Sequence, residues 1–170
     1  MRIPTVSWCC LAMLGWCGCA GYHLGPANGV QAGAKTIEVL PFNNQTLEPR
    51  MGDAVSQALR EEMQTDATYR LVSRGGSDVV LTGTLKGYHR EGLSFLNQDV
   101  TTAVNYRAGL TAHVVARETG SGKILLEKDI TGYTLVRVGT DLTSADRQTM
   151  TLLADDLARN ITVALTEGAW

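Results

Sequence analysis

Alternation of side-chain character over residues 100–117 constrains the fold of this chain more than any other feature. One set of alternate positions is mostly apolar, and the other is mostly polar or charged. A period of two is typical of a β-strand with one buried and one solvated face, the usual arrangement in an antiparallel sheet. The segment therefore needs neighbouring strands and an apolar layer against one face. The apolar set comprises Val100, Val104, Tyr106, Ala108, Leu110, Ala112, Val114 and Ala116, with Thr102 as its polar member.

Other segments show strand patterns before and after this one. Residues 123–138 form a long or bent strand that follows a hairpin loop at 118–122. Shorter strands are predicted at residues 36–42 and 69–72. A longer strand covers residues 78–90, and its apolar face comprises Val79, Leu81 and Leu85. Its opposite face is predicted to hold Thr82, Thr84, Lys86, Tyr88 and Arg90.

Two segments have the apolar period of an α-helix. The first covers residues 49–65, and the second begins near Thr143 and continues toward the end of the chain. Thr143 and Asp146 resemble a capping box at the start of the second helix. Amphipathic helices of this kind cover one face of a sheet. We therefore predict an α+β fold, a two-layer sandwich with two helices packed on one face of a mostly antiparallel four- to five-stranded sheet.

All four cysteines of the chain lie within its first nineteen residues. Arg2 precedes a short apolar stretch, and small residues follow it, which is the pattern of a secretory signal peptide. The stretch is shorter than the roughly 20 apolar residues that a membrane-spanning helix needs. A cysteine after small residues at this junction indicates a lipoprotein signal, in which the cysteine is lipidated. Cys19, which follows Gly18, fits best, and Cys17, beside Trp16, is the alternative.

These features predict three parts of the chain. Residues 1–18 are a lipoprotein signal peptide, residues 19–35 a lipidated flexible tether, and residues 36–170 a single α+β domain. The mature chain has no cysteine after Cys19, so its core must be stable without a disulfide. Removing the signal, which holds one base and no acid, changes the formal net charge from −2 to −3. We expect no nucleic-acid partner, because such proteins usually present a strongly basic face.

No set of residues indicates catalysis or a cofactor. His23, His89 and His113 lack the mutual spacing of metal ligands. Residues 120–123 superficially resemble a phosphate-binding loop, but they lead into a strand and lack the full motif, which requires a helix. No nucleophile is paired with a base. We therefore expect no enzyme, no catalytic residue, no metal site and no cofactor.

Segments spread over the mature chain match, in order, those of a known protein family. The first is Cys19-Ala20-Gly21-Tyr22-His23-Leu24, and the others are residues 37–49, 58–62, 69–72, 80–85, 105–107, 119–125 and 167–170. Together they resemble the LptE-type lipopolysaccharide-assembly lipoproteins, whose opening Cys-Gly-Tyr-His-Leu differs from this one by an inserted alanine. The order and spacing of the segments carry the resemblance.

The resemblance implies a lipid-anchored protein on the periplasmic side of the outer membrane. Members of this family plug the β-barrel of an LptD-type translocon, assist its assembly and take part in lipopolysaccharide transport to the outer leaflet. The expected partners are thus an LptD-type barrel, lipopolysaccharide and the outer membrane, the last through the lipid anchor on Cys19. The alternative is a periplasmic activator or pilotin that docks on a cell-wall synthase or a secretin, because residues 37–46 also resemble the first strand of such modules. A third hypothesis, a periplasmic hydrolase, has no residue in its favour.

The polar face of the sheet supplies the candidate ligand-binding residues. Cations beside an aromatic ring suit a phosphate-bearing amphiphile, because charge-assisted hydrogen bonds are stronger than neutral ones. The alternative is an ordinary solvated face, and Glu127 and Asp129 on the next strand weaken any basic patch. The candidate face is expected to present Lys86, Tyr88 and Arg90 beside Arg107 and His113.

Residues 92–99 are predicted to form a loop with an unusual apolar tip. The tip holds Leu93, Phe95 and Leu96, where turns are normally polar. One interpretation is that these side chains contact the barrel wall or lipid. The other is that they fold back over the end of the sheet, since single exposed apolar residues are common.

Overall fold

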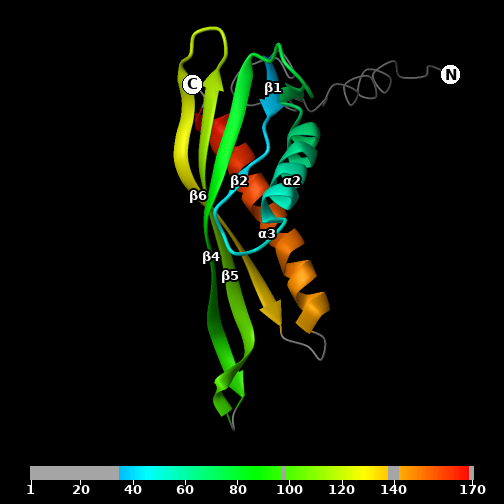
Figure 1. Ribbon diagram of the computed structural model, residues 1–170, viewed down its shortest axis with the longest axis vertical. Helices are drawn as coiled ribbons and strands as arrows, with labels where there is room; N and C mark the ends of the chain where they lie inside the picture. Colours follow the sequence, from blue (N-terminus) through cyan, green and yellow to red (C-terminus); the bar gives the residue numbers. More distant parts are fainter. Residues whose placement is uncertain (1–34, 97–98, 138–141, 169–170) are drawn as a thin grey trace, which may run out of the picture.

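The predicted strands and helices follow one another in the expected order, with one short strand added. The computed structural model describes residues 35–96, 99–137 and 142–168. Figure 1 shows the arrangement of its elements. In chain order they are β1 (Lys35–Val39), β2 (Asn43–Asn44), α2 (Met51–Asp66), β3 (Tyr69–Leu71), β4 (Val79–Leu96), β5 (Asp99–Glu118), β6 (Ile124–Arg137) and α3 (Leu142–Gly168).

Within the described residues, six strands form one sheet of mixed direction. Its order is β3-β1-β4-β5-β6, and β2 pairs with β4. Strand β1 runs parallel to β3 and β4, whereas β4, β5 and β6 are antiparallel. The prediction of a mostly antiparallel sheet of four to five strands is corrected accordingly. Helix α2 accounts for the parallel pair β1–β3, because a helical crossover between adjacent strands returns the chain to the same end of the sheet.

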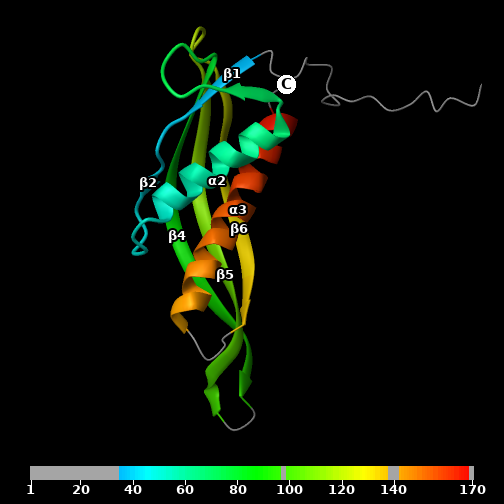
Figure 2. The same ribbon diagram turned by 90° about the vertical axis from the view of Figure 1, so that its right-hand side faces the viewer.

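Both helices lie on the same side of the sheet, as Figure 2 shows. The alternation predicted for residues 100–117 is confirmed where burial is described, because the even positions from Tyr106 to Ala116 are buried. The helices supply the opposing layer. Burying one such large apolar side chain contributes about 1.5–3 kcal/mol, so this shared core holds the helices on the sheet. Its large, fully buried helical side chains are Met51, Val55, Leu59, Met63, Leu153, Leu157, Ile161 and Leu165.

Helix α3 approaches β6 closely at one glycine. A Cβ atom added to Gly132 would lie 2.7 Å from the backbone nitrogen of Leu157 and 2.9 Å from its Cα atom. Hydrogen bonds fix the helix on both sides of this contact. The N–H of Tyr133 donates to Asp156 Oδ2 at 2.9 Å, and Asn160 Nδ2 donates to the carbonyl oxygen of Thr131 at 3.1 Å. The helix therefore lies directly against the outer backbone edge of β6.

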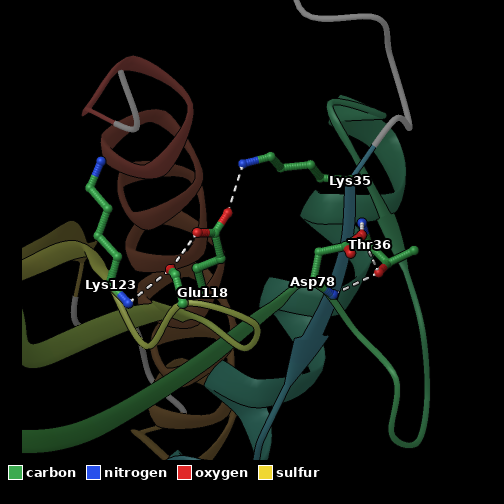
Figure 3. A network of polar contacts seen from close by, with 6 residues as sticks. Lys35, Thr36, Asp78, Glu118 and Lys123 are labelled. Carbon is green, nitrogen blue, oxygen red and sulfur yellow. Dashed lines mark hydrogen bonds and ion pairs between the residues drawn. The ribbon is translucent and has the colours of Figure 1, made fainter.

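Polar contacts join β1, β4 and the β5–β6 hairpin at the end of the sheet where β1 begins (Figure 3). Asp78 Oδ2 accepts hydrogen bonds from the N–H and the hydroxyl of Thr36, both at 2.7 Å. The N–H of Asp78 donates in return to Thr36 Oγ1 at 2.8 Å. Lys35 pairs with Glu118 at 3.2 Å, and Glu118 accepts a hydrogen bond from Ser121. These contacts fix the first residues of β1 on the sheet.

We expect Gly132→Ala to destabilise the protein by roughly 1–3 kcal/mol, as overpacking of a close contact does. The added methyl group meets the backbone of α3, which cannot move without losing its own core contacts. Gly120→Ala is the matched control, because a Cβ at Gly120 meets nothing within 4 Å. Denaturant unfolding measures both variants. Equal stability of the two variants would contradict the close approach of α3 to β6.

The Asp78–Thr36 contact predicts a loss of stability in acid. The hydrogen bonds from the Thr36 N–H and hydroxyl hold the pKa of Asp78 below its ordinary value. A carboxyl whose pKa is lower in the folded state stabilises the protein above its unfolded pKa of about 3.9, and the contribution disappears as pH falls through the folded pKa. Urea unfolding should show Asp78→Asn less stable than the wild type at neutral pH, with the difference shrinking below pH of about 4. A difference that stays constant with pH would disprove this role of the carboxylate.

Candidate functional site

A β-bulge in β4 determines which face each candidate residue occupies. Leu85 lies opposite Ala112 and Gly87 opposite Thr111, so Lys86 is an extra residue in β4. An extra residue shifts the alternation of a strand by one position. Before the bulge the odd residues of β4 face the helices, and after it the even residues do.

The structure contradicts the expectation that one polar face holds Lys86, Tyr88, Arg90, Arg107 and His113. Tyr88 lies opposite Leu110, and Arg90 lies opposite Ala108. Both partners are buried on the helix side, so Tyr88 and Arg90 share that side. The remaining cations stay on the outer face, which the helices do not cover. The bulge has therefore divided the predicted cluster into two groups.

Arg90 is the centre of the helix-side group. Its guanidinium carbon lies 5.3 Å from the ring centroid of Tyr88 and 5.4 Å from that of Tyr106. Its Nη2 atom pairs with Asp146 Oδ1 at 2.9 Å, and its Nε atom donates to the Tyr88 hydroxyl. Burial raises the pKa of Tyr88 above its ordinary value. Arg90 thus ties the β4–β5 hairpin beyond the bulge to the first turns of α3.

Lys86 and His113 form the outer-face group with two carboxylates of β6. Lys86 Nζ lies 3.0 and 3.2 Å from the two carboxylate oxygens of Asp129. His113 Nδ1 is 2.7 Å from Asp129 Oδ1, and its Nε2 is 3.7 Å from Glu127 Oε1. The hydrogen bonds with His113 and Lys86 hold the pKa of Asp129 below its ordinary range. The carboxylates therefore neutralise this end of the expected basic patch.

Arg107 is exposed on the same outer face, but farther along β5. It lies opposite Glu91 of β4 and Leu135 of β6. Leu135 is 69% exposed, and Tyr133, two residues earlier on β6, is 51% exposed. This part of the outer face therefore combines an arginine with exposed apolar and aromatic side chains.

The apolar residues predicted at a loop tip lie within β4, which continues to Leu96. Leu93 occupies a second irregularity, between Gly92 and Ser94, and is 46% exposed. The backbone of Phe95 pairs with Ala103, and that of Leu96 pairs with Asp99. The loop prediction for these residues is wrong because repeated register shifts remove the period of two from this part of β4. Figure 1 shows the β4–β5 hairpin extending beyond both helices.

Tyr106 and Asp146 are partners of Arg90 that the sequence pattern does not indicate. The pattern predicts Tyr106 on the apolar face of its strand and Asp146 in a capping box with Thr143. The helix in fact begins at Leu142, so Thr143 lies inside it. One signal that could have located the bulge is Gly87, since a glycine inside a strand often marks one.

The predicted lipidation site, Cys19, lies outside the described residues. Within residues 35–96, 99–137 and 142–168, no group of three or more His, Cys, Asp or Glu side chains is suited to holding a metal ion. The helices of this same part are too short or too polar to span a membrane.

Three solved structures share the fold of this chain. Protein CT253 from Chlamydia trachomatis has a TM-score of 0.58 at 7% identity, over 79% of this chain and 97% of its own. Protein XCC0632 from Xanthomonas campestris has a TM-score of 0.55 at 9% identity, over 86% and 92%. A minor lipoprotein from Acinetobacter baumannii has a TM-score of 0.52 at 13% identity, over 78% and 93%. At these identities the likeness concerns the fold alone.

The sequence itself matches one family. No curated protein matches the chain in sequence. The family match covers residues 34–165, which include every described strand and most of α3, and its description is lipopolysaccharide-assembly. This match confirms the resemblance found in the separate sequence segments. The chain therefore belongs to the LptE family.

Proposed function

We propose that this protein is an outer-membrane lipoprotein that plugs and helps to assemble an LptD-type β-barrel and takes part in lipopolysaccharide transport to the outer leaflet. The family match over residues 34–165 carries the proposal. Lipid on Cys19 anchors the chain on the periplasmic side, once residues 1–18 are removed as a signal peptide. The residues between Cys19 and β1 act as the tether. The protein works by binding and has no catalytic role of its own.

The uncovered face of the sheet supports a role inside a larger partner. Figure 2 shows both helices on one side of the sheet, and none of the described helices or strands covers the opposite face. Tyr133 and Leu135 project from the open face, and exposed apolar groups of this kind mark interaction sites when they cluster. We assign this face to the wall of the barrel. Leu93, Phe95 and Leu96, near the end of the hairpin, are proposed contacts with the barrel or with lipid.

The two separated cation groups are the proposed contacts with lipopolysaccharide. Lys86 and Arg107 would receive phosphates on the outer face, and Arg90 with Tyr88 would do so on the helix side. The cations Lys86 and Arg90 already pair with carboxylates that are 54% and 41% exposed, Asp129 and Asp146 respectively. Exposed pairs of this kind contribute only about 0–1 kcal/mol, so a phosphate can replace the carboxylate at little cost.

Purification from detergent-solubilised outer membrane should recover a large β-barrel protein in near-equal amount. Leu135→Asp should lower the recovered barrel about tenfold, because burial of one leucine is worth about 1.5–3 kcal/mol. Leu47→Asp is the matched control, since Leu47 is 99% exposed and precedes α2, away from this face. Recovery of a cell-wall synthase or a secretin in place of the barrel would refute the proposal and support the activator or pilotin hypothesis.

Separate substitutions should locate the lipopolysaccharide contact. We expect Arg90→Gln, or the double change Lys86→Gln with Arg107→Gln, to weaken binding about tenfold or more, because a hydrogen bond to a charged group is worth about 1.5–3 kcal/mol. Arg90→Lys keeps the charge and removes the planar group that contacts the two tyrosine rings. Lys123→Gln, in the β5–β6 hairpin, removes the same charge elsewhere. Binding is measured at low salt, where screening is weakest. Unchanged affinity in both groups of variants would eliminate these residues as contacts.

A further inference from the structure

The first half of β6 has a free backbone edge beside a groove. Among the described residues, strand β6 is the last strand of the sheet order and pairs only with β5. Between this edge and α3 lies a groove of about 340 Å³. Its walls are residues 128–131 of β6 and Asn160, Val163, Ala164 and Glu167 of α3. Figure 1 shows the later turns of α3 beside β6 at this end of the sheet.

Helix α3 shows which backbone groups of β6 point away from β5. The N–H of Tyr133 and the carbonyl of Thr131 are bonded to side chains of α3, so both residues direct their backbone groups outward. Because these directions alternate along a strand, the backbone groups of Glu127 and Asp129 also point outward. No hydrogen bond to these groups occurs within the described part of the chain. Unpaired edge groups of this kind are a template for another strand.

The groove also offers apolar surface on its helix side. Ile130 is buried, whereas Val163 of α3 is 44% exposed at the groove. A strand paired with the edge would direct alternate side chains toward Val163 and Ala164 and the others toward the outer face. A strand edge that faces a helix across a groove is a known geometry for binding an extended peptide.

Charge determines which occupant fits. If two copies of this chain paired residues 127–129 antiparallel, Glu127 of each would lie opposite Asp129 of the other, and like charges directly opposite destabilise a strand pair. A strand of a different protein with basic side chains opposite Glu127 and Asp129 avoids this repulsion. Asp129 is already bonded to Lys86 and His113, so Glu127 is the carboxylate with fewer partners. Two carboxylates line the groove itself, Asp129 and Glu167, together with the cation Lys128.

We propose that the edge of β6 at Glu127–Asp129 binds an extended strand of a partner protein by strand addition. The bound strand carries basic side chains opposite Glu127 and Asp129 and apolar side chains toward Val163 and Ala164. It ends before Thr131, where Asn160 and Asp156 already occupy the outward backbone groups. This site adjoins the outer-face group, because Asp129 pairs with Lys86 and both carboxylates contact His113. The strand uses the outward backbone groups of Glu127 and Asp129, whereas the proposed phosphate contact uses the side chain of Lys86.

Amide hydrogen exchange of the purified protein tests the site. The probe is a short synthetic peptide of alternating lysine and valine, blocked at both ends. At a peptide concentration about ten times the dissociation constant, exchange at Glu127 and Asp129 should slow about tenfold. The amide of Tyr133, which is already bonded to Asp156, should not change. A peptide of alternating glutamate and valine should protect neither residue.

Two variants separate strand addition from simple charge attraction. Glu127→Pro removes an outward N–H, which edge strands tolerate, whereas Glu127→Gln removes only the charge. We expect the proline variant to bind the lysine–valine peptide about tenfold more weakly than the glutamine variant, the usual effect of one lost hydrogen bond. Val163→Gln places a longer, neutral side chain in the groove from α3 and leaves the β6 backbone groups unchanged. It should cause a similar loss even if the proline variant does not fold.

Three outcomes would overturn the proposal. The first is no protection of Glu127 and Asp129 by the lysine–valine peptide. The second is undiminished binding by Val163→Gln together with equal binding by the Pro and Gln variants at Glu127. The third is protection of the same amides that rises with protein concentration in the absence of peptide, which would assign the edge to a second copy of the chain.

Discussion

The pairing of β4 with β5 is the interaction on which the rest of this structure depends. Strands β1 and β2 attach to β4, and β6 attaches to β5. The inward face of β5 supplies the continuous apolar surface from Ala108 to Ala116 on which the helices pack. A break in the β4–β5 register therefore changes what every later residue of β4 meets. The bulge at Lys86 is such a break, and it moves Tyr88 and Arg90 to the helix side.

Regular alternation made β5 predictable from the sequence, and its absence explains the errors elsewhere. The inward set from Tyr106 to Ala116 follows from the period of two alone. In β4 the period of two predicts the face of each side chain only as far as Leu85. The extra residue Lys86 then shifts the alternation, and the periodic pattern alone does not reveal it. The contacts of Arg90 depend on Tyr106 and Asp146, which are distant in sequence, so no local pattern could have assembled them. The parallel pairing of β1 with β3 depends likewise on the position of α2.

The two ends of the sheet are stabilised in different ways. At the end where β1 begins, Asp78 and Thr36 exchange hydrogen bonds, and Lys35 pairs with Glu118. At the other end the β4–β5 hairpin extends past the helices (Figure 2), and Arg90 connects its base to α3. The end where β1 begins is therefore held by contacts among several strands, whereas the base of the hairpin is held to α3 through Arg90.

In both groups proposed to bind lipopolysaccharide, a carboxylate of the protein competes with phosphate for the cation. Arg90 is paired with Asp146, and Lys86 with Asp129, yet these carboxylates are about half exposed. An exposed pair is worth about 0–1 kcal/mol, whereas a new charge-assisted hydrogen bond is worth about 1.5–3 kcal/mol. The freed carboxylate returns to water, which solvates it well. The two tyrosine rings beside Arg90 would remain after the exchange and hold the guanidinium in place. Internal pairing therefore keeps these cations ordered without preventing them from binding phosphate.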